Sequence, residues 1–189
     1  QTVGIVANQP KVMAGCLDSN ASRKAGRFVR FCDAFNIPVL TLVNVKGFKA
    51  DKASEKSISR AAAKLTYAFA DASVPKVTVI VGEAFGSAGL TMNSKSIGAD
   101  IVYAWPNAQI GMMDAKMAVK VMYPEADAKE LREKAAAYAE LQSSAVAAAK
   151  RGYVDDIIEP AGTRKRVIAA FEMLYTKRED RPVKKHGTV

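Results

Sequence analysis

The chain of 189 residues has room for one domain or two very small ones, and at this length a core forms without disulfide or metal staples. Hydrophobic residues make up 49% and charged residues 25%, which excludes an intrinsically disordered chain, and no run of about 18 uncharged apolar residues is present to span a membrane. A single histidine, His186, excludes most histidine-based catalysis, whereas the net charge of +9 raises the question of an anionic partner.

The first half of the chain alternates between apolar runs and amphipathic segments. The continuous apolar run after residue 38 is typical of a strand buried on both faces of a sheet. Polar residues around position 20 supply possible helix caps. In chain order, we predict a strand at Val3–Asn8, a strand or hairpin arm at Lys11–Leu17, a helix at Lys24–Asn36, a strand at Val39–Val45 and a helix from Ser54 to Ala72.

The second half continues the alternation and predicts an α/β fold with largely parallel strands and crossover helices. A long alanine-rich, charged stretch near residue 140 predicts a strong helix, which Gly152 caps. The predicted elements are a strand at Lys76–Val81, a helix at Ala88–Ser96, short strands at Ile101–Ala104 and Ala108–Met112, helices at Ala115–Met122 and Ala126–Arg151, an extended segment at Tyr153–Ile158 and a helix at Pro160–Tyr175.

Basic residues fall into two groups, neither of which alternates with aromatic residues as a nucleic-acid stacking platform does. No helix-turn-helix or zinc-finger pattern is present either, so we expect no nucleic-acid partner. A basic surface equally suits an anionic cofactor, an acidic partner or a solvated helix face. The two groups are Arg23, Lys24, Arg27, Arg30, Lys129, Arg132 and Lys134 on predicted helices, and Lys177, Arg178, Arg181, Lys184 and Lys185 in the C-terminal tail.

The two cysteines, Cys16 and Cys32, have no metal-ligand spacing and are too few for a disulfide framework. We expect them to be small buried side chains in a reducing compartment, which indicates a cytoplasmic location. The chain begins inside a predicted strand and shows no basic-then-apolar leader. These features predict a fragment of a longer protein.

A glycine-rich segment, Gly82–Leu90, follows one buried strand and precedes a helix. Small residues there let a ligand approach the backbone, and free N–H groups at the helix start can hold a phosphate or a developing oxyanion. Tight strand-to-helix packing is an equally good reason for the glycines. The P-loop pattern is absent, and Ser87 has no histidine base other than His186 in the tail, which excludes a serine hydrolase.

A second glycine turn, Val43–Phe48, follows the preceding buried strand. Because turns at the carboxyl ends of neighbouring parallel strands meet at one edge of a sheet, the two turns can converge on one ligand oxygen. Two converging backbone N–H groups would form an oxyanion hole, a device that requires no histidine.

Several long motifs occur in an order that resembles the acyl-CoA carboxyltransferase family. This family includes the β subunits of biotin-dependent acetyl- and propionyl-CoA carboxylases and the carboxyltransferase subunits of biotin-dependent methylmalonyl-CoA decarboxylases. The resemblance covers essentially the whole chain. Its motifs are Val3–Pro10, Ala25–Pro38, Phe85–Ala88, Gly98–Asp100, Tyr103–Pro106, Ala148–Asp155 and Lys184–Gly187.

The resemblance implies a crotonase/ClpP-like ββα superhelix, in which stacked turns give two sheets set at an angle with helices outside. It also implies that residues 1–189 form the C-terminal, biotin-side domain of a longer protein with two such halves. The backbone amides of Ser87 and Ala88 match those that hold the biotin ureido oxygen in the family. Gly47 and Phe48 match a turn beside that pocket, and Gly86, Gly89 and Leu90 complete the predicted cofactor-binding set. No metal site is predicted.

The implied activity is transfer of CO2 from carboxybiotin to the α-carbon of a short-chain acyl-CoA, with backbone amides stabilising the ureido oxyanion. Biotin would be carried on a biotin carboxyl carrier protein or biotinylated subunit. The other partners would be an N-terminal carboxyltransferase half and further copies of the chain, with no membrane insertion. Two alternatives stay open: the reverse reaction in a sodium-pumping decarboxylase, and a non-catalytic assembly module.

Four features depart from the family pattern. Lys46 replaces a common proline before the Gly-Phe turn, and Ser87 replaces a glycine. Leu90 occupies a position that helps set acyl-chain preference, and the segment 49–58 lacks the usual glycine-rich, tyrosine-containing stretch. These differences concern substrate choice and the shape of the pocket.

Overall fold

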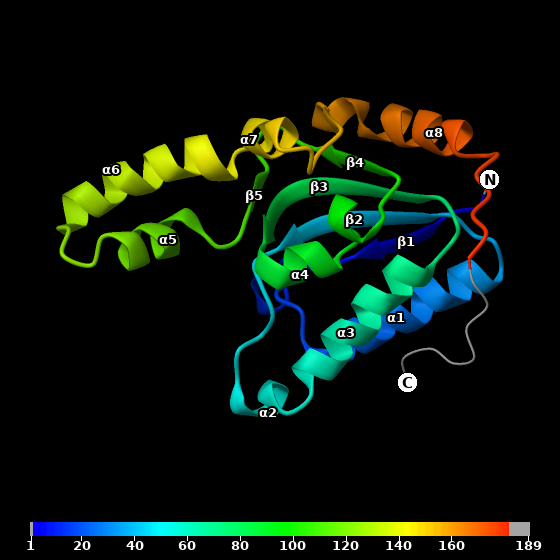
Figure 1. Cartoon of the computed structure of the whole chain (residues 1–189), viewed down its shortest axis with the longest axis horizontal. Helices are drawn as coiled ribbons and strands as arrows, with labels where there is room; N and C mark the ends of the chain where they lie inside the picture. The colour runs from blue at the N-terminus through cyan, green and yellow to red at the C-terminus, as the bar shows by residue number, and fades with distance from the viewer. Residues whose placement is uncertain (1, 182–189) are drawn as a thin grey trace.

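A parallel sheet forms the centre of the computed structural model, which describes residues 2–181. Strands lie in the order β1-β2-β3-β4-β6, all pairs parallel, and β5 pairs with β3. The amino-terminal part of β3 pairs with β4 and its carboxyl-terminal part pairs with β5, so the sheet divides at this strand (Figure 1). The strands are β1 (Gly4–Ala7), β2 (Val39–Val45), β3 (Lys76–Phe85), β4 (Ile101–Ala104), β5 (Gln109–Gly111) and β6 (Asp156–Ile157).

Helices cover both faces of the sheet (Figure 1). Two long helices, α1 and α3, lie side by side on one face, and α8 lies on the other. The α-helices are α1 (Ser19–Ala34), α2 (Lys52–Glu55), α3 (Ile58–Asp71), α4 (Gly86–Thr91), α5 (Ala115–Met122), α6 (Ala128–Tyr138), α7 (Ala145–Lys150) and α8 (Thr163–Met173). Short 3-10 turns are η1 (Met13–Gly15), η2 (Lys95–Ile97) and η4 (Pro160–Gly162), and η3 (Ala139–Ser143) is a π-helix.

Side chains alternate between the two faces of the strands and form a core on each. The larger core joins β2 residues such as Val39 and Val43 to Leu65 and Phe69 of α3. The smaller core packs β3 and β4 against α8. Burying apolar side chains on both faces of the strands explains why β2 is continuously apolar, as the sequence predicts, and confirms an α/β fold with parallel strands.

The predicted strand or hairpin arm at Lys11–Leu17 is wrong. This segment forms η1, and positive φ angles at Met13, Ala14 and Gly15 turn the chain sharply. Only Leu17 pairs with a strand-like neighbour, Phe48, because the Leu17 N–H donates to the Gly47 carbonyl at 3.0 Å. Of the apolar side chains in this segment, Leu17 is buried, whereas Val12 and Met13 are exposed.

Two predicted helices have different boundaries because of local caps. Helix α1 begins at Ser19 rather than Lys24, since the Asp18 carboxylate accepts a hydrogen bond from the Ala21 N–H at 2.7 Å. The helix predicted from Ser54 to Ala72 divides into α2 and α3. The Asp51 carboxylate caps α2 by accepting from the Ser54 N–H at 2.6 Å.

The single helix predicted at Ala126–Arg151 is also wrong. It divides into α6, the π-helix η3 and α7, because Ser144 takes an extended conformation. Ser144 pairs with Gln109 of β5, and its hydroxyl accepts from the Ala147 N–H to cap α7. A contact distant in sequence therefore overrides the strong helix propensity of this stretch.

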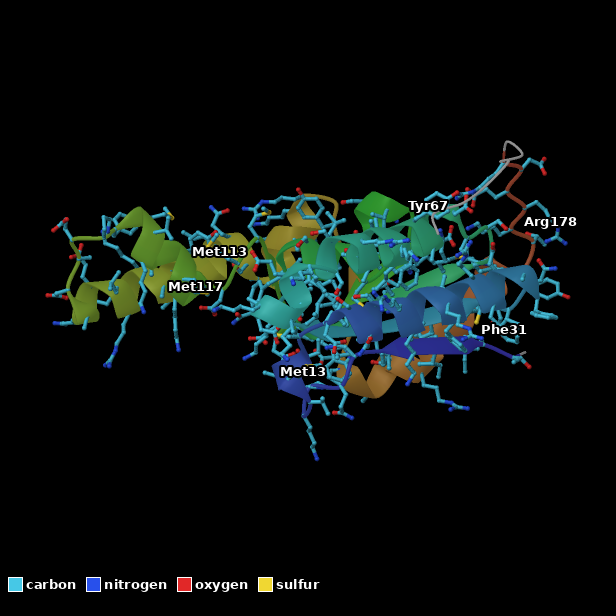
Figure 2. All side chains as sticks on the ribbon, turned by 90° about the horizontal axis from the view of Figure 1, so that it is seen from below. Met13, Phe31, Tyr67, Met113, Met117 and Arg178 are labelled. Atoms are coloured by element: carbon cyan, nitrogen blue, oxygen red, sulfur yellow. The ribbon has the colours of Figure 1, made fainter. Side chains whose placement is uncertain are left out.

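Helices α5 and α6 form an arm that extends away from the sheet (Figures 1 and 2). Ala115 and Val119 of α5 pack against Ala135 of α6 in a small separate core. The opposite face of the arm leaves Met117 and Val121 largely exposed, at 63% and 74%. No helix within residues 2–181 is long and apolar enough to cross a membrane.

Candidate active site

Strand β3 is longer than predicted and runs through Phe85 before α4 begins at Gly86. Gly86 has a φ of +58°, which favours glycine, and a Cβ there would lie 3.1 Å from the Met112 carbonyl oxygen. A Cβ at Gly89 would lie 2.7 Å from the Ala84 backbone carbon. The first glycine therefore allows the turn, and the second allows α4 to pack directly on β3.

The first turn of α4 presents backbone donors at the carboxyl end of β3. The N–H groups of Ser87 and Ala88 precede the first intrahelical hydrogen bond, and no side chain of residues 2–181 caps the helix. The Ser87 residue is exposed, whereas the Ala88 side chain is buried in the larger core. The role of these two backbone donors in holding an oxyanion stays a prediction.

The second predicted turn lies at the same edge of the sheet. Val45 at the end of β2 is opposite Ala84 of β3, and the Lys46 ammonium lies 3.6 Å from the Glu83 carboxylate. A Cβ at Gly47 would meet no atom within 4 Å, so packing among residues 2–181 does not demand glycine there. The carbonyl of Gly47 and the N–H of Lys49 both bond to Leu17, which directs the Phe48 N–H away from Leu17.

A cavity of about 520 Å³ lies beside the start of α4. Its volume falls in the range of small-molecule pockets. Gly86, Gly89 and Leu90 line it, whereas Ser87, Ala88, Gly47 and Phe48 lie outside its lining. The apolar part of the wall consists of Leu90 together with Val43, Ile80, Ala84, Met92, Val102, Ile110 and Met112.

The polar wall of this cavity comes from residues that the sequence analysis did not select. These residues lie in α6, η3 and the segment after α7, about 50 positions beyond the glycine turn. They are Tyr138, Gln142, Ser143, Arg151 and Tyr153, and the polar residues Thr78, Ser94, Lys95 and Ser96 complete this wall. Gln142 and Ser143 lie in the π-helix, which no periodicity in the sequence reveals.

The charged groups of the cavity already have protein partners. The Arg151 guanidinium donates to the Gln142 carbonyl at 2.8 Å and to its side-chain oxygen, and the Lys95 ammonium lies 2.8 Å from the Asp155 carboxylate. The Ser143 hydroxyl, by contrast, is buried without a hydrogen-bond partner among residues 2–181. No carboxylate lines the cavity within these residues. Polar contacts with a ligand would therefore rest on neutral groups and the backbone.

A larger hollow, of about 890 Å³, lies between β1, η1 and α1 and shares one lining residue, Met92, with this cavity. Its wall includes the exposed aromatic side chains of Phe28 and Phe31, with Arg23, Lys24 and Arg27 along it. Figure 2 shows Phe31 on α1 and Met13 on η1. The hollow contains none of the residues that the sequence predicts for the site.

A parallel α/β sheet with backbone donors at a strand end and a cavity beside them is an arrangement suited to stabilising a small anion. The carboxyl transferase domain model matches residues 1–189, and the chain belongs to this family. The resemblance stated from the sequence motifs is thereby confirmed, although the Lys184–Gly187 motif lies outside the described residues.

Two curated relatives are similar to this chain over its whole length. The chain is 50% identical over its whole length to methylmalonyl-CoA decarboxylase subunit alpha of Veillonella parvula, and covers 37% of that protein. It is also 50% identical to the mitochondrial propionyl-CoA carboxylase beta chain of Homo sapiens, again over its whole length, and covers 35% of it. The chain thus spans little more than a third of these relatives.

Solved structures confirm the predicted fold. The crystal structure of the transcarboxylase 12S hexamer, with methylmalonyl-coenzyme A and methylmalonic acid bound, matches 98% of this chain and 36% of its own chain. The TM-score is 0.94 and the sequence identity 49%. The β subunit of P. aeruginosa geranyl-CoA carboxylase also matches, with a TM-score of 0.77 and 27% identity. The fold is therefore the crotonase-like fold of the carboxyltransferases.

Proposed function

We propose that this chain is the biotin-side, C-terminal half of a biotin-dependent carboxyltransferase that acts on a short-chain acyl-CoA of the propionyl or methylmalonyl class. The observation that carries the proposal is the pair of uncapped backbone donors at Ser87 and Ala88, beside a cavity of about 520 Å³, in a chain of this family. Relatives named for propionyl-CoA and methylmalonyl-CoA, at 50% identity, support the substrate class.

The residues at the strand end fit a neutral, compact ring bearing one oxygen that gains charge. When bound, biotin would supply the carboxyl group to be transferred, and the group to be stabilised would be its ureido oxygen. The N–H groups of Ser87 and Ala88 would donate to this oxygen, and the apolar wall that includes Leu90 would exclude water beside it. In the net transfer, the carboxyl group would leave the ureido nitrogen of carboxybiotin for the acyl α-carbon, and the α-proton of that carbon would pass to the same nitrogen. No side-chain acid or base of this chain is required.

The proposed partners are an acyl-CoA-binding half, a biotin-bearing carrier protein and further copies of the chain. Two exposed apolar surfaces support protein contacts: Phe31 and Phe35 on α1, and Met117 and Val121 on the α5–α6 arm. The matched 12S structure is described as a hexamer assembly. An interface on the arm would complete burial of α5, which packs against α6 on one face only.

The test is a pair of substitutions at Ser87 in the assembled enzyme, with methylmalonyl-CoA and free biotin as substrates. Ser87→Pro deletes the N–H, and a first-turn proline is compatible with the helix. Ser87→Ala keeps the N–H and removes only the hydroxyl. We expect Ser87→Pro to lower kcat by roughly 10²–10³-fold and Ser87→Ala to retain most of the activity.

The opposite pattern, in which Ser87→Ala is as damaging as Ser87→Pro, would assign the chemistry to the hydroxyl and contradict the backbone-donor account. Full transfer activity in an assembly from which this chain is omitted would support the alternative of a non-catalytic assembly module. Assaying both methylmalonyl-CoA decarboxylation and propionyl-CoA carboxylation establishes the direction. The backbone donors serve both directions equally, because each passes through the same charged oxygen.

A further inference from the structure

A line of amide groups crosses the carboxyl ends of β1, β2 and β3, directly before the two glycine turns. The Asn8 side-chain oxygen accepts from the Asn44 N–H at 2.9 Å, and the Asn8 side-chain nitrogen donates to the Asn44 carbonyl and, at 3.0 Å, to the Gly15 carbonyl. The Asn44 side-chain oxygen in turn accepts from the Glu83 N–H at 3.0 Å. We name this Asn8–Asn44–Glu83 line the amide bridge.

The amide bridge continues the hydrogen bonding between strands at the point where the backbone pairing ends. Strand β1 ends at Ala7, and the Asn8 side chain then makes the bonds to Asn44 that a further strand residue would make. Between β2 and β3, Val43 pairs with Ile80 but Val45 pairs with Ala84, so β3 bulges opposite Asn44. The side chain of Asn44 spans this bulge.

Gly82 lies at the centre of the bulge, against the Asn44 side chain. A Cβ at Gly82 would lie 2.6 Å from the Asn44 side-chain oxygen and 2.8 Å from its Cγ. The bulge therefore closes around the Asn44 amide, and glycine at position 82 is the residue that leaves room for it. The bulge therefore requires glycine at position 82, whereas the turn into α4 requires Gly86 and the packing of α4 on β3 requires Gly89.

We propose that Asn44 is a positioning residue that fixes the Ser87 and Ala88 donors relative to the Gly47–Phe48 turn. This proposal rests on the proposed function of the site. The argument is geometric: β3 passes from the bulge at Gly82 through its pairs with β5 to the start of α4. The Gly47–Phe48 turn begins two residues after Val45. The Asn44 side chain ties the bulge to β2 by a hydrogen bond, and the partly exposed Lys46–Glu83 ion pair lies beside it.

The first experiment measures kcat and KM in the assembled enzyme for Asn44→Ala and Asn44→Asp. A shift of about 1 Å in a catalytic group can cost roughly 10²-fold in rate, so we expect Asn44→Ala to lower kcat about tenfold or more. The KM for acyl-CoA should change by less than about twofold, since this half is not its main binding site in the proposed function. Asn44→Asp keeps the acceptor oxygen and should retain most of the activity.

A control variant separates positioning from general loss of stability. Asp33→Ala removes an acceptor of three hydrogen bonds, from the Ser73 N–H and hydroxyl and the Val74 N–H, at the opposite end of the sheet. We expect this variant to lower the midpoint of thermal unfolding and to leave kcat within about twofold at temperatures where it is folded. An equal loss of kcat in Asp33→Ala and Asn44→Ala overturns the proposal.

A double-mutant cycle provides the second experiment. Gly82→Ala should reduce kcat strongly in the native background, because the new methyl group displaces the Asn44 side chain. In the Asn44→Ala background the conflict disappears, and the same substitution should change kcat by less than about threefold. Additive losses would show that the two residues act separately and would overturn the proposal.

The failure of the proposed function has a different outcome. If the native assembly transfers no carboxyl group, the proposed function fails, and hydrogen–deuterium exchange over residues 82–90 then decides the positioning role. Asn44→Ala should raise the exchange rate of this segment about tenfold or more, and Asp33→Ala should leave it unchanged. Unchanged exchange in Asn44→Ala would overturn the proposal independently of catalysis.

Discussion

The two ends of strand β3 differ in how their polar groups are satisfied. At the amino end, the Lys76 ammonium is fully buried and donates to the Phe69 carbonyl at 2.7 Å. The Asp100 carboxylate accepts from the Lys76 N–H at 2.7 Å and lies 2.9 Å from the Lys177 ammonium. At the carboxyl end, the first donors of α4 have no side-chain cap within residues 2–181, and a cavity lies beside them.

The two ends of β3 therefore have different roles. Polar groups at the amino end hold the strand in the fold, whereas backbone donors at the carboxyl end lie beside a cavity. The ionic cluster at the amino end joins β3, the residue before β4 and the segment after α8. In it, the Asp100 carboxylate accepts hydrogen bonds from the Lys76 N–H and the Lys177 ammonium. At the carboxyl end, the first donors of α4 lack a side-chain cap within residues 2–181, and the neighbouring Gly86 lines the cavity. In a parallel sheet the ends that carry loops into helices are the ones that bind ligands, and the unequal satisfaction of polar groups is the physical form of that rule here.

The largest expected effect is at Gly89, where α4 meets the carboxyl end of β3. In Gly89→Ala the new methyl carbon would lie 2.7 Å from a backbone carbon of Ala84, so α4 must move away from the strand. We expect a loss of about 3 kcal/mol in the free energy of unfolding, with loss of carboxyl transfer. Urea denaturation measures the first and the transfer assay the second.

Gly162→Ala is the matched control, because a Cβ at this position would meet no atom within 4 Å. Its free energy of unfolding should stay within about 0.5 kcal/mol of the native value. If the Gly89→Ala and Gly162→Ala variants are equally stable, the close approach of α4 to β3 does not fix the position of α4.

The second prediction concerns the buried charge at the amino end. Burial, followed by the like charge of Lys177, lowers the pKa of Lys76 to about 8; Arg181 acts in the same direction, and Asp100 and Glu179 oppose it. Below pH 8 the folded protein carries the full cost of the buried charge. Between pH 8 and 10.5 the unfolded chain binds more protons at this residue, so its contribution to the free energy of unfolding rises with pH.

Lys76→Met removes this titration. We expect the stability of the variant minus that of the native protein to fall by on the order of 3 kcal/mol as the pH rises from 7 to 11. Urea denaturation at five pH values measures the difference, in which the titration of other groups cancels. A difference that does not vary with pH would show that Lys76 keeps an ordinary pKa in the folded protein.

Local patterns predicted the elements whose limits are set locally. Val39–Val45 matches β2 because both its faces are buried, and Ala115–Met122 matches α5 because the Asp114 carboxylate caps its start by accepting from the Lys116 and Met117 N–H groups. Some errors, such as the start of α1 at the Asp18 cap, concern local features that the sequence analysis missed, whereas two others arose where distant contacts decide. Ser144 leaves the helix to pair with β5, and β3 extends beyond Val81 because it pairs with β5 after the bulge.

The candidate site was predictable to the same extent. The glycine turn and the family motifs indicated Gly86, Gly89 and Leu90, which line the cavity. The roles predicted for Ser87 and Ala88 stay predictions, as do those of Gly47 and Phe48. The polar wall, including Ser143 and Arg151, depends on a π-helix and on chain folding over about 50 residues, and neither leaves a periodic signal.

A smaller effect is expected when the ionic cluster at the amino end loses one partner. The ammonium of Lys177 is 14% exposed and contacts both Asp100 and Glu179, at 2.9 and 3.3 Å. Lys177→Met should cost about 2 kcal/mol of unfolding free energy, because it leaves a largely buried carboxylate with less compensation. Arg166→Met breaks the exposed 3.9 Å pair with Asp156 and should cost less than about 0.5 kcal/mol. If urea denaturation gives equal losses of unfolding free energy for Lys177→Met and Arg166→Met, the buried ionic cluster is no more stabilising than an exposed ion pair.

The smallest effect is expected at the cavity beside the carboxyl end, where the Ser143 hydroxyl has no partner among residues 2–181. Ser143→Ala removes a group that makes no hydrogen bond there, so the free energy of unfolding should change by less than about 0.5 kcal/mol or rise. Thr78→Val is the comparison: the Thr78 hydroxyl lines the same cavity, donates to the Asn93 carbonyl at 2.8 Å and accepts from the Asn93 side chain at 2.9 Å. Its loss should cost about 1–2 kcal/mol. A substantial loss of unfolding free energy in Ser143→Ala would mean that this hydroxyl has a hydrogen-bond partner in solution. The difference between the two ends of β3 would then rest on the backbone donors of α4 alone.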